Sequence, residues 1–420
     1  MNAFSDLGLS EPLVRAVDAL GYDEPTPIQQ QAIPPLITGR DLLGCARTGT
    51  GKTAAFALPL LHRMAETPRR PPSKGCRVLV LAPTRELALQ VQDSFDAYAK
   101  HLRHYRSTSI IGGVGQRPQV DTMRKGVDVL CACPGRLLDL IGQGHIDLST
   151  LEAFVLDEAD RMLDMGFLPD VRRVIKELPT ERHNLFFSAT MPPDIVELSA
   201  SILHDPVKVE VSRESTTAEG ITQRVMFVDK AGKKDLILQV TGDERVERAL
   251  VFSRTKHGAN RIVKLLDKNG IGAAAIHGNK SQGARQRALA GFIDGSIKVL
   301  VATDIAARGI DVDSISHVIN YDLPNIPETY VHRIGRTARA GSTGMALSFC
   351  DEEEIAYLRD IEKLTGERIQ VAGDRIGLPA EVLDPGPVGK TRRSAPPKKK
   401  PGGRSRSRGR RSGRSRGPRR

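Results

Sequence analysis

The sequence predicts an α/β fold in which two parallel-sheet domains follow one another and a basic C-terminal tail stays disordered. Apolar runs of strand length alternate with helical patterns over residues 42–211, which favours a mostly parallel sheet covered by helices. A second alternation of the same kind begins after a polar stretch and continues to residue 365. The predicted boundaries are 1–212 for the first domain, 213–220 for a linker, 221–368 for the second domain and 369–420 for the tail.

The strands are predicted from their apolar runs and from the polar residues that end them. In the first domain these runs lie at 42–43, 78–81, 109–111, 127–131, 153–156, 185–187 and 207–211. In the second domain they lie at 225–228, 249–252, 273–276, 298–302, 317–321 and 345–349. Helical patterns occupy 29–36, 54–64 and 351–365, and residues 1–41 are expected to form short helices before the first strand. Small, polar and cationic residues gather at the carboxyl ends of the strands, where parallel sheets bind their ligands.

The positive charge of the chain is concentrated in its tail. Lys and Arg exceed Asp and Glu by 12 over the 420 residues, yet residues 390–420 hold 15 basic and no acidic residues. The remainder carries a net charge of −3, so a nucleic-acid site on the folded part must be a local patch. Pro-rich 384–397 and Arg/Ser/Gly-rich 402–420 cannot bury enough apolar area to fold. These uncompensated charges favour an auxiliary RNA anchor over a merely solubilising segment.

Several features indicate a cytoplasmic protein without a membrane-bound part. No apolar stretch reaches the roughly 18–20 residues of a membrane span, and the first residues lack the pattern of a signal peptide. The spacing of Cys45, Cys76, Cys131, Cys133 and Cys350 fits neither a zinc site nor a disulfide framework. Free cysteines of this kind are typical of a reducing compartment.

Residues 46–53, which read Ala-Arg-Thr-Gly-Thr-Gly-Lys-Thr, have the features of a phosphate-binding loop between a strand and a helix. Gly49 and Gly51 let the backbone turn and point its N–H groups inward, and the helix N-terminus adds partial positive charge. Lys52 is expected to reach the β- and γ-phosphates, and the Thr53 hydroxyl to hold Mg²⁺. Because Ala46 replaces the Gly that begins the strict pattern, an ordinary glycine turn stays open as an alternative for this stretch alone.

An acidic pair follows the apolar run at 153–156. Asp157 suits the Mg²⁺ shell, because Mg²⁺ takes oxygen ligands and keeps several waters. Glu158 suits the group that polarises the attacking water. Either carboxylate alone is more often a solvated surface charge, but the pair and the upstream loop together favour one shared site.

Two further stretches suggest nucleotide contacts. The Pro-rich turn at 21–29 precedes the phosphate loop, and Gln29 offers both an amide donor and an acceptor to an adenine ring, although a structural turn is the alternative. Residues 332–339 are predicted to lie on a helix, so Arg336 and Arg339, three apart, would project from one face. Two guanidinium groups there are expected to meet the γ-phosphate across a cleft, with a solvated basic helix as the alternative.

At these residues the chain resembles the DEAD-box RNA helicases, most closely the bacterial RhlE-like group. The resemblance covers residues 4 to about 365 and rests on ordered motifs at 21–29 with Phe4 upstream, 46–53, 83–88, 112–113, 134–136, 157–160, 188–190, 251–255, 282–285, 303–311 and 332–339. It implies two RecA-like domains and an RNA-stimulated ATPase that hydrolyses ATP to ADP and phosphate. It also implies local unwinding or remodelling of RNA duplexes and RNA–protein complexes through ATP-driven closure of a two-domain cleft.

The resemblance assigns roles to individual residues. Catalysis is implied for Lys52, Asp157, Glu158, Arg336 and Arg339. ATP contacts are implied for Tyr22, Gln29, Thr48, Gly49, Thr50, Gly51, Lys52, Thr53 and Asp311. Mg²⁺, held largely through water, is implied for Thr53 and Asp157. Coupling is implied for Asp160, Ser188, Thr190 and His332. RNA contacts are implied for Pro83, Thr84, Arg85, Gly112, Gly113, Pro134, Gly135, Arg136, Arg254, Gly278, Arg285 and Thr303.

Three positions depart from the family pattern. Arg47 stands where Gln is common, Ala338 replaces a common Gly, and Cys133 replaces a Thr, which leaves one hydroxyl contact to an RNA phosphate open. The family suggests partners in ribosome assembly or RNA turnover, or a role in cold adaptation. Only 4% of the residues are aromatic, so RNA recognition is expected to be largely independent of sequence. A duplex-DNA helicase, a passive RNA chaperone and a nucleotide-dependent RNA clamp are the competing hypotheses.

Overall fold

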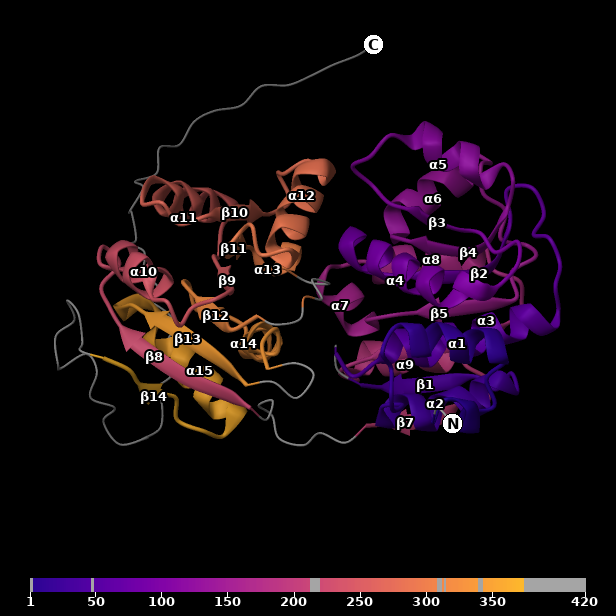
Figure 1. The fold of residues 1–420 in the computed structure, drawn as a ribbon, viewed down its shortest axis with the longest axis horizontal. Coiled ribbons are helices and arrows are strands. Elements are labelled where there is room, and N and C mark those ends of the chain that lie inside the picture. The colour runs from indigo at the N-terminus through magenta and orange to yellow at the C-terminus, as the bar shows by residue number, and fades with distance from the viewer. Residues whose placement is uncertain are drawn as a thin grey trace, which may run out of the picture. The chain divides into compact units, whose positions relative to one another are not determined.

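The computed structural model describes residues 3–46, 49–211, 220–307, 312, 315–338 and 343–373 (Figure 1). The chain up to Leu378 forms one compact unit, which contains two parallel sheets. Thr48, Asp311, Arg339, most of the predicted linker and the tail from residue 374 lie outside the described residues.

The first sheet has seven parallel strands in the spatial order β3-β4-β2-β5-β6-β1-β7. Its strands are β1 Leu42–Cys45, β2 Cys76–Leu81, β3 Ser107–Ile110, β4 Val127–Ala132, β5 Ala153–Leu156, β6 His183–Ser188 and β7 Val207–Glu210. Its helices are η1 Ser5–Leu7, α1 Glu11–Ala19, α2 Pro27–Ile37, α3 Lys52–Glu66, α4 Arg85–Tyr98, η2 Ala99–His101, α5 Gln116–Met123, α6 Pro134–Gly142, α7 Ala159–Asp164, α8 Leu168–Lys176 and α9 Pro193–Ile202.

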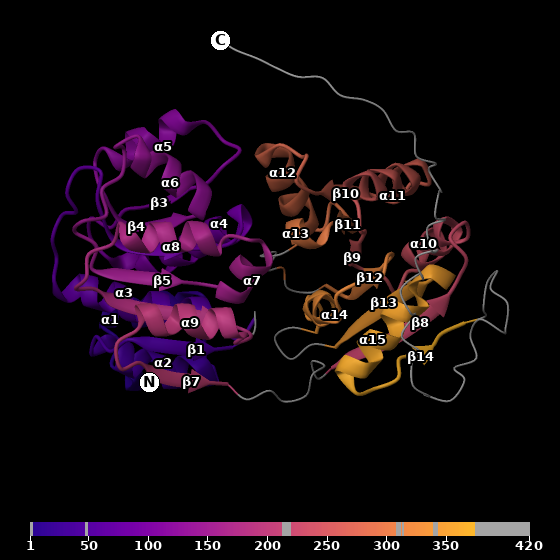
Figure 2. The same ribbon diagram turned by 180° about the vertical axis from the view of Figure 1, so that it is seen from behind.

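Helices cover both faces of this sheet, which explains why its strands read as continuous apolar runs. Successive side chains of β2 point to opposite faces: Val78 and Val80 join the core under α1–α4, whereas Leu79 and Leu81 join the core under α5–α9. Figure 1 and Figure 2 show these two helical layers from opposite sides.

The second sheet repeats the same arrangement, with seven parallel strands in the order β10-β11-β9-β12-β13-β8-β14. Its strands are β8 Ile221–Phe227, β9 Ala249–Phe252, β10 Ala273–Ile276, β11 Val299–Ala302, β12 His317–Asn320, β13 Gly344–Cys350 and β14 Gln370–Val371. Its helices are α10 Lys233–Gly242, α11 Lys256–Lys268, α12 Gln282–Ile293, α13 Asp304–Ala307, α14 Pro327–Ile334, η3 Glu352–Glu354 and α15 Ile355–Thr365. Helices α10 and α11 cover one face, and α12–α15 cover the other.

The prediction of two parallel-sheet domains is confirmed, and β5, β9 and β10 have the predicted bounds. The other predicted strands differ from the structure by one or two residues at one or both ends, and two differences are larger. Strand β8 begins at Ile221 rather than at residue 225, because its first residues pair with β13. Strand β14 lies within the segment predicted as a disordered tail, so the ordered chain continues past residue 368. Both residues of β14 are exposed and carry no apolar pattern, and only their pairing with Arg224 and Val225 makes them a strand.

Two further observations concern the helices and the cysteines. Among the described residues, none of the helices combines the length and the apolar character needed to span a bilayer. All five cysteines are free thiols.

Candidate active site

The loop after β1 is shaped by two glycines and by hydrogen bonds from α2. Gly49 and Gly51 have φ of +86° and +87°, in the left-handed region. Gln29 Nε2 donates to the Gly51 carbonyl at 3.1 Å, and Thr26 Oγ1 donates to the Thr50 carbonyl at 2.8 Å. A Cβ on Gly51 would lie 2.4 Å from Gln29 Nε2, so a larger residue would displace the Gln29 amide and strain the left-handed backbone. The backbone at residues 49–51 is therefore held in place ahead of α3, as a phosphate-binding loop requires.

Gln29 has a structural function that the sequence analysis did not assign to it. Its Oε1 accepts a hydrogen bond from Thr26 N at 2.9 Å, and this pair forms a capping box at the start of α2. The spacing Thr-x-x-Gln before an apolar helix was a visible signal for that role. Tyr22, 37% exposed, lies beside the buried ring of Phe4. The contacts of Tyr22 and Gln29 with adenine stay predictions.

Lys52 and Asp157 bring the loop and the acidic pair together. Lys52 Nζ lies 3.9 Å from Asp157 Oδ1, and both side chains are less than a tenth exposed. Neither atom has a hydrogen-bond partner among the described residues. Burial raises the pKa of Asp157, while the charge of Lys52 opposes that rise. A buried cation and a buried carboxylate oxygen, each with unused hydrogen-bonding capacity, fit a phosphate group and a hydrated Mg²⁺.

Glu158 stands in a strained backbone position next to Asp157. It has φ +55° and ψ +52° and forms the N-cap of α7. Its Oε2 accepts a hydrogen bond from Arg161 Nη1 at 2.5 Å, and both side chains are buried. A non-glycine residue in the left-handed region is uncommon and is found most often where a site requires a particular geometry.

Asp160, Ser188 and Thr190 form one hydrogen-bonded group between α7 and the end of β6. Asp160 Oδ2 accepts from Thr190 N at 2.9 Å and from Thr190 Oγ1 at 3.0 Å. Ser188 Oγ accepts from Asp160 N at 3.2 Å and donates to the Thr190 carbonyl at 2.7 Å. The residues predicted to couple hydrolysis to movement are therefore in direct contact within the first domain, whereas His332 lies on α14.

The residues predicted to contact RNA in the first domain follow three neighbouring strands. Pro83, Thr84 and Arg85 come after β2, Gly112 and Gly113 after β3, and Pro134, Gly135 and Arg136 after β4. These strands are parallel neighbours, so the three loops share one edge of the sheet.

Side chains at these loops already have local partners. Thr84 Oγ1 accepts from Leu87 N and caps α4. The Arg85 guanidinium lies where a Cβ on Gly113 would be, at 2.1 Å, so the glycine is required for this packing. Cys133 is the N-cap of α6 without a side-chain capping bond, and burial raises the pKa of its thiol to about 12. A neutral thiol at this position replaces the hydroxyl that the family pattern has.

Arg285 and its neighbour Gln282 both contact Glu86. Arg285 Nη2 lies 2.7 Å from Glu86 Oε2, and Gln282 Nε2 donates to Glu86 Oε1 at 3.1 Å. Gln282 Oε1 also accepts from Arg85 Nη1 at 3.4 Å. Two residues predicted to contact RNA, Arg85 and Arg285, thus belong to one polar cluster with Glu86, which the sequence analysis gave no role.

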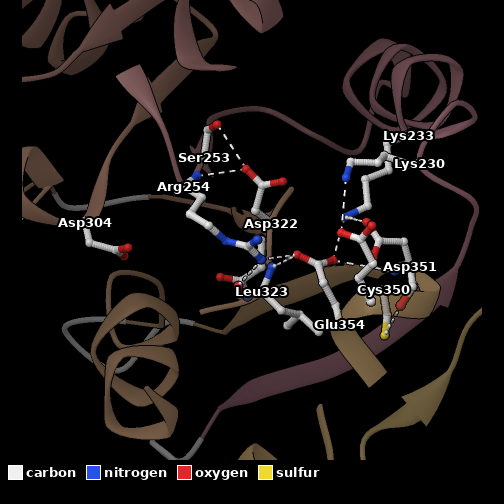
Figure 3. Close-up of polar contacts among 12 residues, drawn as sticks. Lys230, Lys233, Ser253, Arg254, Asp304, Asp322, Leu323, Cys350, Asp351 and Glu354 are labelled. Atoms are coloured by element: carbon white, nitrogen blue, oxygen red, sulfur yellow. Dashed lines mark hydrogen bonds and ion pairs between the residues drawn. The ribbon is translucent and has the colours of Figure 1, made fainter. Parts of the chain in front are cut away.

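The other second-domain residues predicted to contact RNA lie after strands β9, β10 and β11. Arg254 pairs with the buried Glu354 at 2.6 Å (Figure 3). A Cβ on Gly278 would meet no atom within 4 Å, so the backbone there is open. Thr303 precedes α13, and its carbonyl accepts from Ala306 N.

The helix predicted over 332–339 ends earlier than predicted, and the prediction is wrong for residues 336–338. Helix α14 ends at Ile334, Gly335 is its C-cap, and Ala338 has φ +54°. Past the helix end, the Thr337 hydroxyl donates a hydrogen bond to the Ile315 carbonyl. Arg336 is buried just past the helix end, so it does not lie on the helix that was predicted for it.

Arg333 is a buried residue of this segment that the sequence analysis did not single out. Its guanidinium contacts both carboxylate oxygens of Asp304, at 2.5 and 2.8 Å. It also donates to Asn320 Oδ1 and to the Asp322 carbonyl, and it lies over the ring of Phe252. Arg333 therefore fixes α14, and the arginine segment that follows it, against the carboxyl ends of the strands.

Comparison with known proteins identifies the family of both domains. The model of the DEAD/DEAH box helicase family matches residues 26–198, and that of the helicase conserved C-terminal domain matches residues 232–341. ATP-dependent RNA helicase CshA of Listeria monocytogenes is 42% identical over 88% of this chain and 70% of its own length. ATP-dependent RNA helicase DeaD is 44% identical in Mycobacterium tuberculosis and 42% identical in Escherichia coli. The chain spans 64% and 56% of the length of these two relatives.

Solved structures agree with this comparison. Dbp5 of S. cerevisiae bound to RNA and ADP BeF3 has a TM-score of 0.78 and 32% identity, covering 89% of this chain and 95% of that one. Mss116 bound to ssRNA and UDP-BeF has a TM-score of 0.78 and 26% identity, covering 89% and 79%. With a relative at 42% identity over 88% of the chain, and with both domains matched in order, the chain belongs to the DEAD-box helicase family.

Proposed function

We propose that this ATP-dependent RNA helicase opens RNA duplexes locally, as ATP binding closes a cleft between the two domains and hydrolysis reopens it. The observation that carries the proposal is the pair Lys52 and Asp157, whose buried Nζ and Oδ1 atoms lie 3.9 Å apart without hydrogen-bond partners among the described residues. Such a pair is costly to bury unless a ligand uses it, and a nucleotide phosphate with its cation has the matching charges.

The first domain holds the nucleotide in this proposal. Lys52 contacts the β- and γ-phosphates, Thr53 and Asp157 hold Mg²⁺, and Glu158 takes the proton of the attacking water. When bound, Mg²⁺ neutralises the charge that develops on the phosphate oxygens. Glu158 follows Asp157 directly, and its left-handed backbone forms the N-cap of α7.

The second domain completes the site with cations. Arg336, Arg339 and Asp311 are proposed to reach ATP, with the arginines stabilising charge in the transition state as arginine fingers do. Because ATP and RNA would each bridge the two domains, each must raise the affinity for the other.

RNA is bound through its backbone in this proposal. The loops after β2, β3 and β4 present glycines, prolines, a threonine and arginines at one sheet edge, and these groups suit sugar and phosphate. The solved relatives Dbp5 and Mss116 were bound to RNA. The Arg-rich tail would add a second, sequence-independent anchor.

Three finer assignments belong to the same proposal. The chain is placed in the RhlE-like group of the family, which its ordered motifs resemble most closely. It is placed in the cytoplasm because its cysteines are free thiols without a disulfide framework. Ribosome assembly and RNA turnover are the proposed settings of its partners.

The experiment is strand displacement from a short RNA duplex with ATP and Mg²⁺, comparing the wild-type chain with Lys52→Ala. Displacement should be lost in that variant, whereas Lys234→Ala, an exposed lysine at the corresponding helix start of the second domain, should leave it unchanged. Persistent displacement in Lys52→Ala would favour a passive chaperone. Equal stimulation of ATP hydrolysis by duplex DNA would favour a DNA helicase, and a single turnover without release would favour a clamp.

A further inference from the structure

The second sheet has a counterpart of the phosphate-loop lysine. Strand β8 takes the place in the second sheet that β1 takes in the first, since each lies between the corresponding neighbours in the strand order. Each strand leads to a helix whose N-cap is glycine and whose first residue is lysine: Gly51 and Lys52 before α3, Gly232 and Lys233 before α10. Both lysines are buried, with 6% and 2% exposure.

The surroundings of the two lysines differ in charge. Lys52 has one carboxylate oxygen at 3.9 Å and no hydrogen bond among the described residues. Lys233 Nζ lies 3.0 Å from Asp351 Oδ2 and 2.5 Å from Glu354 Oε2. The chain's own carboxylates thus satisfy Lys233, so the place that would receive a phosphate is already neutralised.

Glu354 uses both of its oxygens in this network, although only 2% of the residue is exposed (Figure 3). Oε2 accepts from Lys233, and Oε1 accepts from Leu323 N at 3.0 Å and from Arg254 Nη2 at 2.6 Å. Arg254 Nη2 also donates to the Leu323 carbonyl, at 3.1 Å. A single buried carboxylate therefore joins α10, the turn after β12 and the loop after β9.

Arg254 is fixed by bonds from its backbone and its guanidinium, yet much of its side chain is exposed. Its side chain is 46% exposed, while Glu354 is buried. Its backbone N–H donates to Asp322 Oδ2 at 2.8 Å, and its guanidinium lies over the ring of Tyr357 at 5.5 Å. A long cationic side chain fixed in this way loses little further conformational entropy when it binds a phosphate.

We propose that Glu354 is a positioning residue for RNA binding, which holds the Arg254 guanidinium ready for an RNA phosphate while Lys233 balances its buried charge. The inference rests on the proposed contact between Arg254 and RNA. In this proposal Lys233, the second sheet's counterpart of Lys52, stabilises the carboxylate that positions an RNA-binding arginine.

The test is a double-mutant cycle with Arg254→Ala and Glu354→Gln, read out by RNA-stimulated ATP hydrolysis on a single-stranded RNA. Glu354→Gln should raise the KM for RNA by about 3- to 10-fold, the effect of freeing one long side chain at an interface. The kcat at saturating RNA and the ATP affinity without RNA should not change. The double variant should have the KM of Arg254→Ala, because Glu354 acts through Arg254.

Two further variants keep the test decisive. Glu353→Gln is the matched control, since its carboxylate is exposed and pairs with the exposed Lys230 at 3.1 Å, so its KM for RNA should stay at the wild-type value. Glu354→Asp keeps the negative charge that neutralises Lys233, but its shorter side chain draws the carboxylate away from Arg254. This variant replaces Glu354→Gln in the test if Glu354→Gln fails to fold.

Each alternative outcome has one meaning. Two outcomes would overturn the positioning role of Glu354 and leave Arg254 as an RNA contact. One is that the two single substitutions have additive effects on the KM for RNA in the double variant. The other is a wild-type KM in both Glu354 variants beside a raised KM in Arg254→Ala. An unchanged KM in Arg254→Ala would remove Arg254 from the proposed RNA site, and the inference with it, while the Lys52 experiment would still judge the helicase mechanism separately.

Discussion

Replacing Glu158 by Gln removes the proposed base while disturbing its surroundings as little as possible. Gln has the same shape and keeps an oxygen that can accept from Arg161 Nη1, which now lies 2.5 Å from Glu158 Oε2. Loss of a positioned general base slows a reaction by roughly 10²–10⁴-fold, which corresponds to about 2.7–5.4 kcal/mol of activation free energy. ATP hydrolysis at saturating RNA should fall by that factor.

The same substitution also affects stability, because Glu158 and Arg161 form a buried ion pair. Removing one partner of such a pair costs about 3–5 kcal/mol of unfolding free energy. Since Gln retains the hydrogen bond, the loss in Glu158→Gln should stay below that range and leave a folded protein. ATP binding should stay nearly intact, and a long-lived complex with RNA should accumulate.

Three measurements separate these effects: the steady-state ATPase rate with RNA, the ATP affinity without RNA and the thermal unfolding midpoint. Glu197→Gln is the control, because Glu197 is 73% exposed and pairs at 3.1 Å with the exposed Arg172 in the same domain. It should behave as the wild type does. A rate within about threefold of wild type in folded Glu158→Gln would exclude Glu158 as the base.

Three further predictions address coupling, the tail and pH. In Asp160→Asn one carboxylate oxygen becomes an amide, so the bond from Thr190 N or the bond from Arg161 N is lost. Strand displacement should then fall by about tenfold more than ATP hydrolysis does. Equal losses would argue against a coupling role. Deleting 390–420 should lower the salt dependence of single-stranded RNA binding by roughly 0.7 log units per lost phosphate contact, and an unchanged slope would make the tail a spacer. Burial lowers the pKa of His183, whose Nε2 bonds to the Arg40 carbonyl at 2.8 Å and whose Nδ1 has no partner among the described residues. The neutral His183 ring therefore stabilises the fold fully above its pKa in the unfolded chain, about 6.5, and this stabilisation is lost as the pH falls through the lower folded pKa. His183→Gln should flatten the decline in unfolding free energy between pH 7.5 and 5.5. An unchanged decline would assign the effect to other groups.

Local patterns were enough for the strands and for the centre of the site. Strand β5 was predicted with its observed bounds because a short apolar run is closed at once by Asp157 and Glu158. The loop before Lys52 was predicted because Gly49, Gly51 and Lys52 lie close together in the sequence, directly before a helical pattern. The meeting of Lys52 with Asp157 followed from placing both at the carboxyl ends of parallel strands.

Features that depend on distant contacts could not be read from the sequence. Helix α14 ends at Ile334, shortly before Thr337 bonds to the Ile315 carbonyl, 22 residues away. Strand β14 exists only through its pairing with β8. Glu354 is one of three consecutive glutamates, yet it alone is buried, because Lys233 and Arg254 reach it from other elements. No periodic pattern distinguishes it from Glu353.

The need for both domains in ATP hydrolysis is tested most directly by Arg339→Ala. The measurement is the ATPase rate with and without RNA, together with the nucleotide affinity without RNA. RNA-stimulated turnover should fall on the order of 10³-fold or more, the effect of an arginine finger. Arg339→Lys should also be impaired, because a point charge cannot replace the guanidinium fork. Nucleotide affinity in the absence of RNA should change little, since most ATP contacts are assigned to the first domain. Full RNA stimulation in Arg339→Ala, with Arg336 intact, would contradict a site shared by the two domains and leave the first domain as a self-sufficient ATPase.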